Sequence, residues 1–208
     1  MTVQYNSIQA DIVDISQAAP LNSDCFLVDS NIWIWMTYSN AGHGEPAWRS
    51  SLMSHYAAFV QVASSVSKIC CCGLSMAELA HTIEKTEREI YERHIGNSIK
   101  PKEYRHNLIA QRNHVVSEVQ AAWAQVTSLA DPLTLTVNTA TTNAAIARCQ
   151  SEKVDGYDLF ILESMKNHGV VQVITDDGDF ATVSGIQVFT VNRNVINAAR
   201  SQGTLLRR

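Results

Sequence analysis

An apolar run that stops on a carboxylate constrains the fold of this chain most strongly. Phe26 to Val28 are continuous apolar residues, and Asp29, Ser30 and Asn31 follow them directly. Such a run suits a strand that is covered on both faces, as in a parallel sheet. Because ligands bind outside the carboxyl ends of strands in open α/β sheets, Asp29 is a candidate functional residue. A purely structural role also stays open, since these polar residues are good N-caps for a helix over 32–38.

The composition is that of an ordinary globular chain. Its 208 residues fit one domain, with 46% hydrophobic and 17% charged residues. The net charge of -4 provides no global positive field, so binding of a polyanion would require metal ions or a local patch. No apolar window is long enough to span a bilayer, and residues 1–20 lack the features of a signal peptide. We therefore expect a cytoplasmic protein without a membrane partner.

Three consecutive cysteines, Cys70 to Cys72, lie inside an apolar run. Neighbouring cysteines are poorly placed for mutual disulfides and differ from the spaced pairs that bind zinc. We expect them to be small buried hydrophobic residues.

The rest of the chain repeats the alternation of strand and helix. Further strands are expected over 69–72, 133–137, 170–174 and 186–190, and helices over 48–67, 76–83, 139–150 and from 154 onward. This order predicts a central parallel sheet with helices on both faces. We divide the chain into a lead (1–24) that packs on the domain, the main domain (25–192), and a C-terminal helix and tail (193–208).

A charged segment interrupts this alternation. Basic and acidic residues are interleaved over 84–118, and Gly96 and Pro101 break the pattern. We expect a helical hairpin insert at about 84–130. A salt-bridged, solvated surface explains the charges. A contact with nucleic acid or a protein partner stays open, and it makes Lys100, Lys102 and Arg105 candidate RNA-binding residues.

The predicted topology brings acids together. Asp29 and Asp177 follow strands, whereas Glu78 and Asp158 stand near helix starts. Right-handed crossovers place strand ends and helix starts on the same rim of a parallel sheet. Carboxylates gathered there raise one another's pKa unless a cation neutralises them, and hard divalent cations prefer oxygen ligands. The expected ligand is Mg²⁺ or Mn²⁺, which can assist phosphodiester hydrolysis.

Two of these acids have alternative interpretations. Ser75 and Glu78 have the spacing of a capping box, which would make Glu78 a structural residue. Asp155 can cap the helix that contains Asp158, and it lies close enough to compete with Asp158 for a place in the site.

The ordered motifs resemble those of the PIN-domain ribonucleases. They are Asp29-Ser30-Asn31 after a strand, 75–79, 158–162 and 175–180, and the resemblance extends from about Phe26 to Asn192. It implies an α/β/α sandwich, with a central parallel sheet and an acidic pocket that binds Mg²⁺ or Mn²⁺ and hydrolyses RNA. Residue by residue, the motifs assign the first three acids to Asp29, Glu78 and Asp158, the fourth to Asp177, and a frequent additional metal-binding acid to Asp179. Three polar residues in the same motifs are candidate substrate contacts: Ser30, Asn31 and Thr175.

The leading hypothesis is therefore a metal-dependent endoribonuclease. A noncatalytic module that binds RNA or protein would share the fold. A phosphatase with Asp29 as nucleophile is disfavoured, because such enzymes usually carry a second Asp two residues later, where this chain has Asn31. The resemblance also allows an antitoxin or other protein partner, and a homodimer, although the long lead and the insert differ from a compact toxin.

Overall fold

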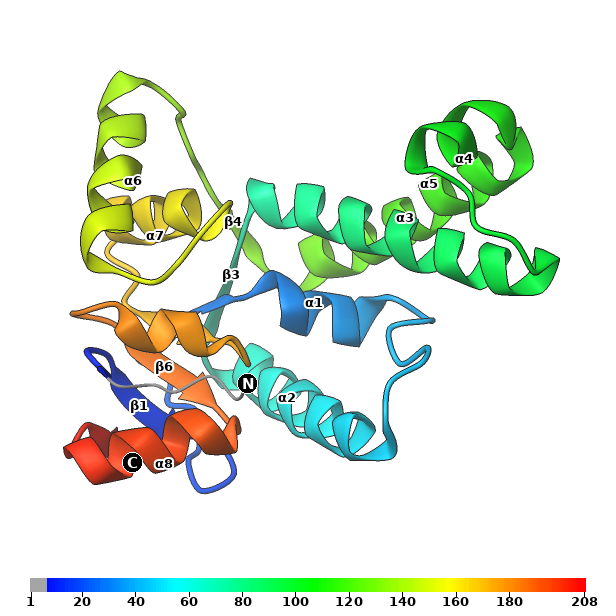
Figure 1. Cartoon of the computed structure of the whole chain (residues 1–208). Helices are drawn as coiled ribbons and strands as arrows, with labels where there is room; N and C mark the ends of the chain where they lie inside the picture. The colour runs from blue at the N-terminus through cyan, green and yellow to red at the C-terminus, as the bar shows by residue number, and fades with distance from the viewer. Residues whose placement is uncertain (1–6) are drawn as a thin grey trace.

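The fold is built on a seven-stranded, all-parallel sheet, seen in a computed structural model that describes residues 7–208 (Figure 1). The strand order is β4-β3-β2-β5-β6-β1-β7. Strand β2 (Cys25–Val28) lies between β3 (Lys68–Cys72) and β5 (Gln172–Ile174), with β6 (Gln187–Thr190) beyond β5. The strand that ends on Asp29 is thus central, as its continuous apolar sequence predicted.

Helices cover both faces of the sheet. Side chains alternate along each strand, so Phe26 and Val28 enter one core and Leu27 enters the other. The first core also contains side chains of α1 (Ser30–Thr37), α2 (Ala47–Val66), α3 (Gly73–Ile95) and α5 (Ile109–Leu129). The second core contains buried side chains of α7 (Asp158–Asn167) and α8 (Arg193–Gln202), and α6 (Thr139–Ser151) packs on α7. The chain is therefore an α/β/α sandwich, as predicted.

The three consecutive cysteines follow the same alternation. Cys70 and Cys72 face one core and Cys71 faces the other, and all three are free and buried. The prediction that they act as small core residues is confirmed.

Both ends of the chain contribute strands that the sequence analysis did not predict. Strand β1 (Asp11–Asp14) lies between β6 and β7 (Leu205–Leu206), so part of the lead is built into the sheet. Arg208 then pairs with Asp24. These strands are too short to show a periodic pattern, and they exist through pairing between distant parts of the chain. Residues 1–6 of the predicted lead lie outside the described residues.

The insert is a helical hairpin that extends away from the sheet (Figure 1). Helix α3 (Gly73–Ile95) forms one arm, α4 (Pro101–Asn107) the tip, and α5 (Ile109–Leu129) the returning arm that packs on α3. Gly96 ends α3 in the left-handed conformation (φ 69°), which glycine adopts without strain. A helix as long as α3 spans about 35 Å, so the tip lies far from the sheet.

Two details of the predicted elements are wrong. Helix α3 starts at Gly73, directly after β3, so Ser75 lies within the first turn as a buried residue and forms no capping box. Strand β4 covers Asp131–Leu133 and not 133–137. It pairs with β3 only as far as Cys72, where β3 ends, so the residues after Leu133 have no strand beside them.

The helix that follows β4 begins as predicted. The Asn138 side chain caps α6 by accepting a hydrogen bond from the Thr141 backbone N–H at 3.0 Å. Over residues 7–208, no helix is both long and apolar enough to cross a membrane.

Candidate active site

The site starts at the end of β2, where Asp29 is held from two directions. Its Oδ1 accepts the Ser30 backbone N–H at 2.6 Å, which makes Asp29 the N-cap of α1. Its Oδ2 accepts the Thr175 hydroxyl at 2.6 Å, and Thr175 directly follows β5. The structural and functional interpretations of Asp29 are therefore compatible, since the cap fixes the direction of the carboxylate.

Two further carboxylates converge on Asp29. Glu78 comes from the second turn of α3 and Asp158 from the first residue of α7. One oxygen from each of the three carboxylates can be chosen so that all lie within 4.8 Å of one another. The Ser30 hydroxyl donates to Glu78 Oε2, so the residue after the first acid orients the second. We call Asp29, Glu78 and Asp158 the acid cluster.

Burial and mutual repulsion make ionisation of the acid cluster costly. Burial is the main reason that the pKa of Asp29 rises to about 7, with further increases from the charges of Glu78 and Asp177. Burial raises the pKa of Asp158 to about 9, with further increases from the charges of Asp29, Glu78, Asp177 and Asp155. The pKa of Glu78 is also raised, chiefly by burial, although its hydrogen bond from Ser30 lowers it. These shifts are those of a site that lacks a compensating positive charge.

The remaining acids lie around this cluster. Asp177 caps the 3₁₀ helix η1 (Gly178–Thr182) by accepting the Asp179 backbone N–H at 2.8 Å, and its charge raises the pKa of all three cluster acids. Asp179 is outside the cluster, and its own pKa is raised by burial and then by Asp177 and Asp155. The predicted metal-binding role of Asp179 therefore gains no direct support from the geometry.

The geometry also separates Asp158 from Asp155. Asp155 is exposed and is not part of the cluster, although its charge raises the pKa of Glu78 and of Asp158. The expected N-cap role of Asp155 is wrong, because α7 begins at Asp158 and its N-cap position is Tyr157. The Asp155 carbonyl accepts the Asp158 backbone N–H at 3.0 Å, and this turn leads the chain into α7, whose first residue is Asp158.

Three candidate substrate contacts lie among the acids. Ser30 and Thr175 are buried and hydrogen-bonded to Glu78 and Asp29, so both orient carboxylates. Thr175 also accepts the Asp177 backbone N–H at 2.8 Å. Asn31 is half-buried and donates to the Thr175 hydroxyl at 3.3 Å, while its Oδ1 has no hydrogen-bond partner among residues 7–208.

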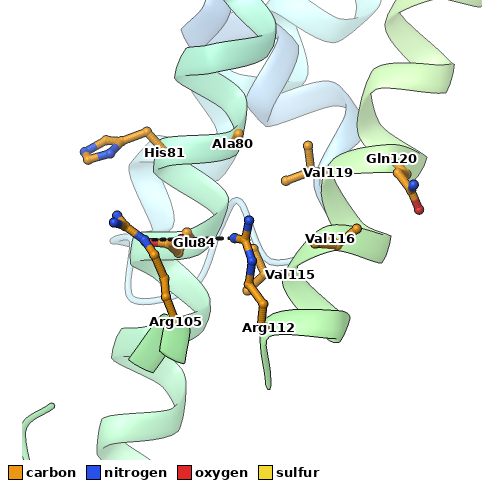
Figure 2. Close-up of a pocket in the computed structure, with 9 residues that line it drawn as sticks. All are labelled: Ala80, His81, Glu84, Arg105, Arg112, Val115, Val116, Val119 and Gln120. Carbon is orange, nitrogen blue, oxygen red and sulfur yellow. Dashed lines mark hydrogen bonds and ion pairs between the residues drawn. The ribbon is translucent and has the colours of Figure 1, made fainter. Parts of the chain in front are cut away.

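The candidate RNA contacts in the insert lie elsewhere. Lys100 and Lys102 are at the tip, where the neighbouring Ile99 backbone contacts Arg88 and Glu92, about 15–21 Å from Glu78 along the axis of α3. Arg105 donates from Nε to both oxygens of Glu84 at 2.7 Å, and Arg112 joins the same carboxylate at 3.2 Å. Figure 2 shows these three side chains beside a pocket of about 300 Å³ between α3 and α5. The structure does not bring the insert's cations to the acid cluster.

A basic residue near Asp176 was not predicted from the sequence. Arg49 lies on α2 with its guanidinium carbon 5.6 Å from the centre of the Trp35 ring, and its charge lowers the pKa of Asp176, although burial raises that pKa more. On the same helix, the Tyr56 hydroxyl contacts Asp176 Oδ1 at 2.9 Å. The separation of seven residues places Arg49 and Tyr56 on one helical face, the only local signal for this arrangement.

Comparison with known proteins supports a family assignment. The sequence model of the family described as "PIN domain" matches residues 26–186. No curated protein matches the sequence.

Two solved structures show distant similarity. One is the VapBC2 structure from Rickettsia felis, determined with a DNA fragment from the promoter, with 12% identity, a TM-score of 0.46, and coverage of 80% of this chain and 98% of that chain. The other is PAE2754 from Pyrobaculum aerophilum, with 14% identity, a TM-score of 0.41, and coverage of 86% and 98%.

Proposed function

The chain belongs to the PIN-domain family, and we propose that it is a metal-dependent endoribonuclease that hydrolyses RNA phosphodiester bonds at the acid cluster. The observation that carries this proposal is the convergence of Asp29, Glu78 and Asp158 to within 4.8 Å from three separate elements. Asp177 is the fourth acid of the proposed catalytic site. Burying like charges this close costs free energy, which a cation bound among them would offset.

The donors fit a hard divalent cation. The cluster consists of carboxylates, and neither a histidine nor a cysteine belongs to it. Mg²⁺ and Mn²⁺ prefer such oxygen ligands, whereas zinc sites usually include nitrogen or sulfur. Asp29, Glu78 and Asp158 would hold the ion, with Asp177 beside them. When bound, the ion would neutralise phosphate charge and lower the pKa of a water molecule.

The protein's own groups prepare the site for this chemistry. Thr175 and the Ser30 backbone N–H fix both oxygens of Asp29, and the Ser30 hydroxyl fixes Glu78. Orientation of ligands by neighbouring hydrogen bonds preserves the geometry that binding and catalysis need. Burial and the neighbouring acids raise the pKa of Asp158 to about 9, so its carboxyl can hold a proton near neutral pH, and a bound cation would favour its charged form instead.

The alternative of an aspartyl phosphatase is less well supported. Such chemistry uses Asp29 as nucleophile with a companion lysine. The charged side chains that shift the pKa of Asp29, Glu78 and Asp158 are all acids. Position 31, where a second aspartate would stand, is an asparagine that donates to Thr175.

The deciding experiment measures cleavage of a labelled single-stranded RNA. Wild-type protein should cleave it internally with Mg²⁺ or Mn²⁺ and lose the activity in excess EDTA. Asp29→Asn should lower kcat/KM by about 100-fold or more, since it removes one charge from the site while it keeps the side-chain size. Asp11→Asn serves as the control, because Asp11 is exposed and begins β1 at the amino end of the strands, whereas the acid cluster lies at their carboxyl ends. RNA binding without cleavage in either metal would favour the noncatalytic module.

A further inference from the structure

The acid cluster needs a positive neighbour if RNA is to lie beside it. Each phosphate of the RNA backbone is anionic, and protein cations that contact phosphates provide much of the affinity for nucleic acid. Arg49 stacks on Trp35, whose ring centre lies 5.6 Å from that of Tyr56, and the Tyr56 hydroxyl contacts Asp176 Oδ1 at 2.9 Å. Asp176 directly precedes Asp177, so Arg49 lies on the flank of the site.

Arg49 is held in place but not fully satisfied. Its guanidinium lies over Trp35, and Nη1 is 3.4 Å from Glu45 on the preceding turn. The Nε atom is buried and has no hydrogen-bond acceptor among the described residues. The buried Nε is out of reach of an external ligand, but the side chain as a whole is 37% exposed, and its solvent-facing part is suited to an anion such as a phosphate oxygen.

A small pocket lies against the first turns of α2, next to Arg49 in the sequence. It has a volume of about 160 Å³. Trp48 forms one wall, and 66% of this side chain is exposed. Val191 directly follows β6 and Ser16 follows β1, so the pocket opens at the carboxyl rim of the sheet, as the acid cluster does. We call this the Trp48 pocket; its lining residues are Ser16, Trp48, Ser51, Leu52, His55, Val191 and Arg193.

We propose that Arg49 and the Trp48 pocket bind a nucleotide that flanks the cleaved phosphate in single-stranded RNA. This inference rests on the proposed ribonuclease function. Arg49 binds the phosphate nearest the acids, and the exposed Trp48 ring stacks on an unpaired base. Arg193, whose side chain is 67% exposed and lies 3.7 Å from Asp14 Oδ2, and His55 add positive or hydrogen-bonding groups at the pocket edge. Stacking of this kind requires a base free of its duplex, which defines the substrate class as single-stranded.

The position of the cations favours this surface over the insert. Arg49 neighbours Asp176 at the rim, whereas Lys100 and Lys102 lie at the distant tip and Arg105 is paired with Glu84. The ends of β6 and β1, which carry the Trp48 pocket, lie two and three places from β2 in the sheet, about 10–15 Å at the usual strand spacing. Only the first of these surfaces lies at the rim that holds the acids.

The test separates RNA binding from cleavage. In full-length protein carrying Asp29→Asn, the affinity for a short single-stranded RNA is measured with Trp48→Ala, Trp48→Phe and Arg49→Gln added singly. Trp48→Ala should weaken binding by about 5- to 100-fold, the range expected for one base–aromatic stack, and Trp48→Phe should restore most of it. Arg49→Gln should weaken binding and reduce its salt slope by about 0.7, as one lost phosphate contact on a single strand does.

Two controls match these changes in chemistry. Lys166→Gln removes an exposed cation in the last turn of α7, away from the rim where that helix begins. Ile109→Ala truncates an apolar side chain that is 71% exposed on the insert. Neither should change the affinity.

The outcomes of the test are distinct. Wild-type affinity in both Trp48→Ala and Arg49→Gln overturns the inference, as does loss of affinity only in a Lys100→Gln/Lys102→Gln variant or failure of the parent protein to bind RNA. If the wild-type protein cleaves RNA while these variants bind it normally, the ribonuclease function stands and the nucleotide site does not. Weakened binding in a protein that cleaves no RNA supports the site and contradicts the nuclease proposal alone.

Discussion

The Thr175 hydroxyl donates to Asp29 Oδ2 at 2.6 Å and accepts the Asp177 N–H at 2.8 Å. One buried side chain thus joins the ends of β2 and β5 and sets the relative position of two acids that are far apart in sequence. Because Thr175 lowers the pKa of Asp29 while burial raises it, this contact also favours the charged form that a cation requires.

Thr175→Val should therefore damage both folding and metal binding. Valine has nearly the same shape, but it leaves the Asp177 N–H without its acceptor, which costs about 1–3 kcal/mol when the group is buried. We expect lower stability in urea and weaker Mn²⁺ binding by calorimetry. Thr37→Val is the matched control, since it removes a hydroxyl that donates only to the Trp33 carbonyl in α1. Equal Mn²⁺ affinity in both variants would contradict the orienting role of Thr175.

Added metal should stabilise the folded protein. A ligand that binds only the native state at 100 times its Kd contributes about 2.7 kcal/mol, which raises the Tm of a domain this size by about 5–10 °C. Asp29→Asn should remove most of the shift seen with Mg²⁺ or Mn²⁺ in a thermal melt. Asp11→Asn should retain it, and an unchanged shift in Asp29→Asn would place the ion elsewhere.

Glu78→Gln tests whether Glu78 is a metal ligand. The alternative role in a capping box with Ser75 does not apply, because α3 begins at Gly73. Glutamine can still accept the Ser30 hydroxyl but carries no charge, so kcat/KM for RNA should fall by about 100-fold. Stability should change by less than about 1 kcal/mol, because the replacement is nearly isosteric. Glu103→Gln, on the exposed tip helix α4, should leave both quantities unaltered. Full activity in Glu78→Gln would exclude it from the catalytic site.

Asp158 and Asp155 should differ in their effect on activity. Asp158→Asn removes a member of the acid cluster, whereas Asp155→Asn removes an exposed charge that only raises the pKa of its neighbours. We expect Asp158→Asn to be inactive and Asp155→Asn to keep most of its turnover in single-turnover cleavage assays. The reverse ranking would assign the third acid to Asp155.

The metal-free protein should lose stability as the pH rises. The pKa values of Asp29 and Asp158 are raised from 3.8 to about 7 and about 9, so the native state keeps protons that the unfolded chain has released. The stabilisation from these protons is complete below about pH 4 and disappears as the pH passes the two native values. Urea midpoints measured in EDTA should therefore fall across this range, and less steeply in Asp158→Asn. A slope unaffected by that substitution would contradict the shift at Asp158.

The acids could be found from sequence because their placement depends on topology. Asp29 ends an apolar strand, Asp158 begins a helix, and right-handed crossovers bring such positions to one rim. The exact helix start was not needed: α3 begins at Gly73, yet Glu78 still reaches Asp29 from the second turn. The observed start of α3 differs from the expected start at residue 76 by three residues, which is less than one helical turn of about 5.4 Å.

Other features depended on contacts between distant segments. The strands β1 and β7 contain few residues; β1 forms where it meets β6, and β7 forms where it meets β1. The pairing of Arg105 with Glu84 could not be read from the local charge pattern, and the suggested contact of Arg105 with RNA stays a prediction. Arg49 had no local signal of function and became a candidate only when α2 was placed beside Asp176.

The parallel α/β architecture and the set of candidate acids could be read from the sequence, because apolar continuity, the alternation of strand and helix and the place of each acid along its element are local properties. Only the tertiary structure decided which acids share a site, how Thr175 and Ser30 orient them, and where cations lie beside them. Those relationships depend on the packing of side chains from separate elements, and periodicity along the chain carries no information about the distance between two such side chains.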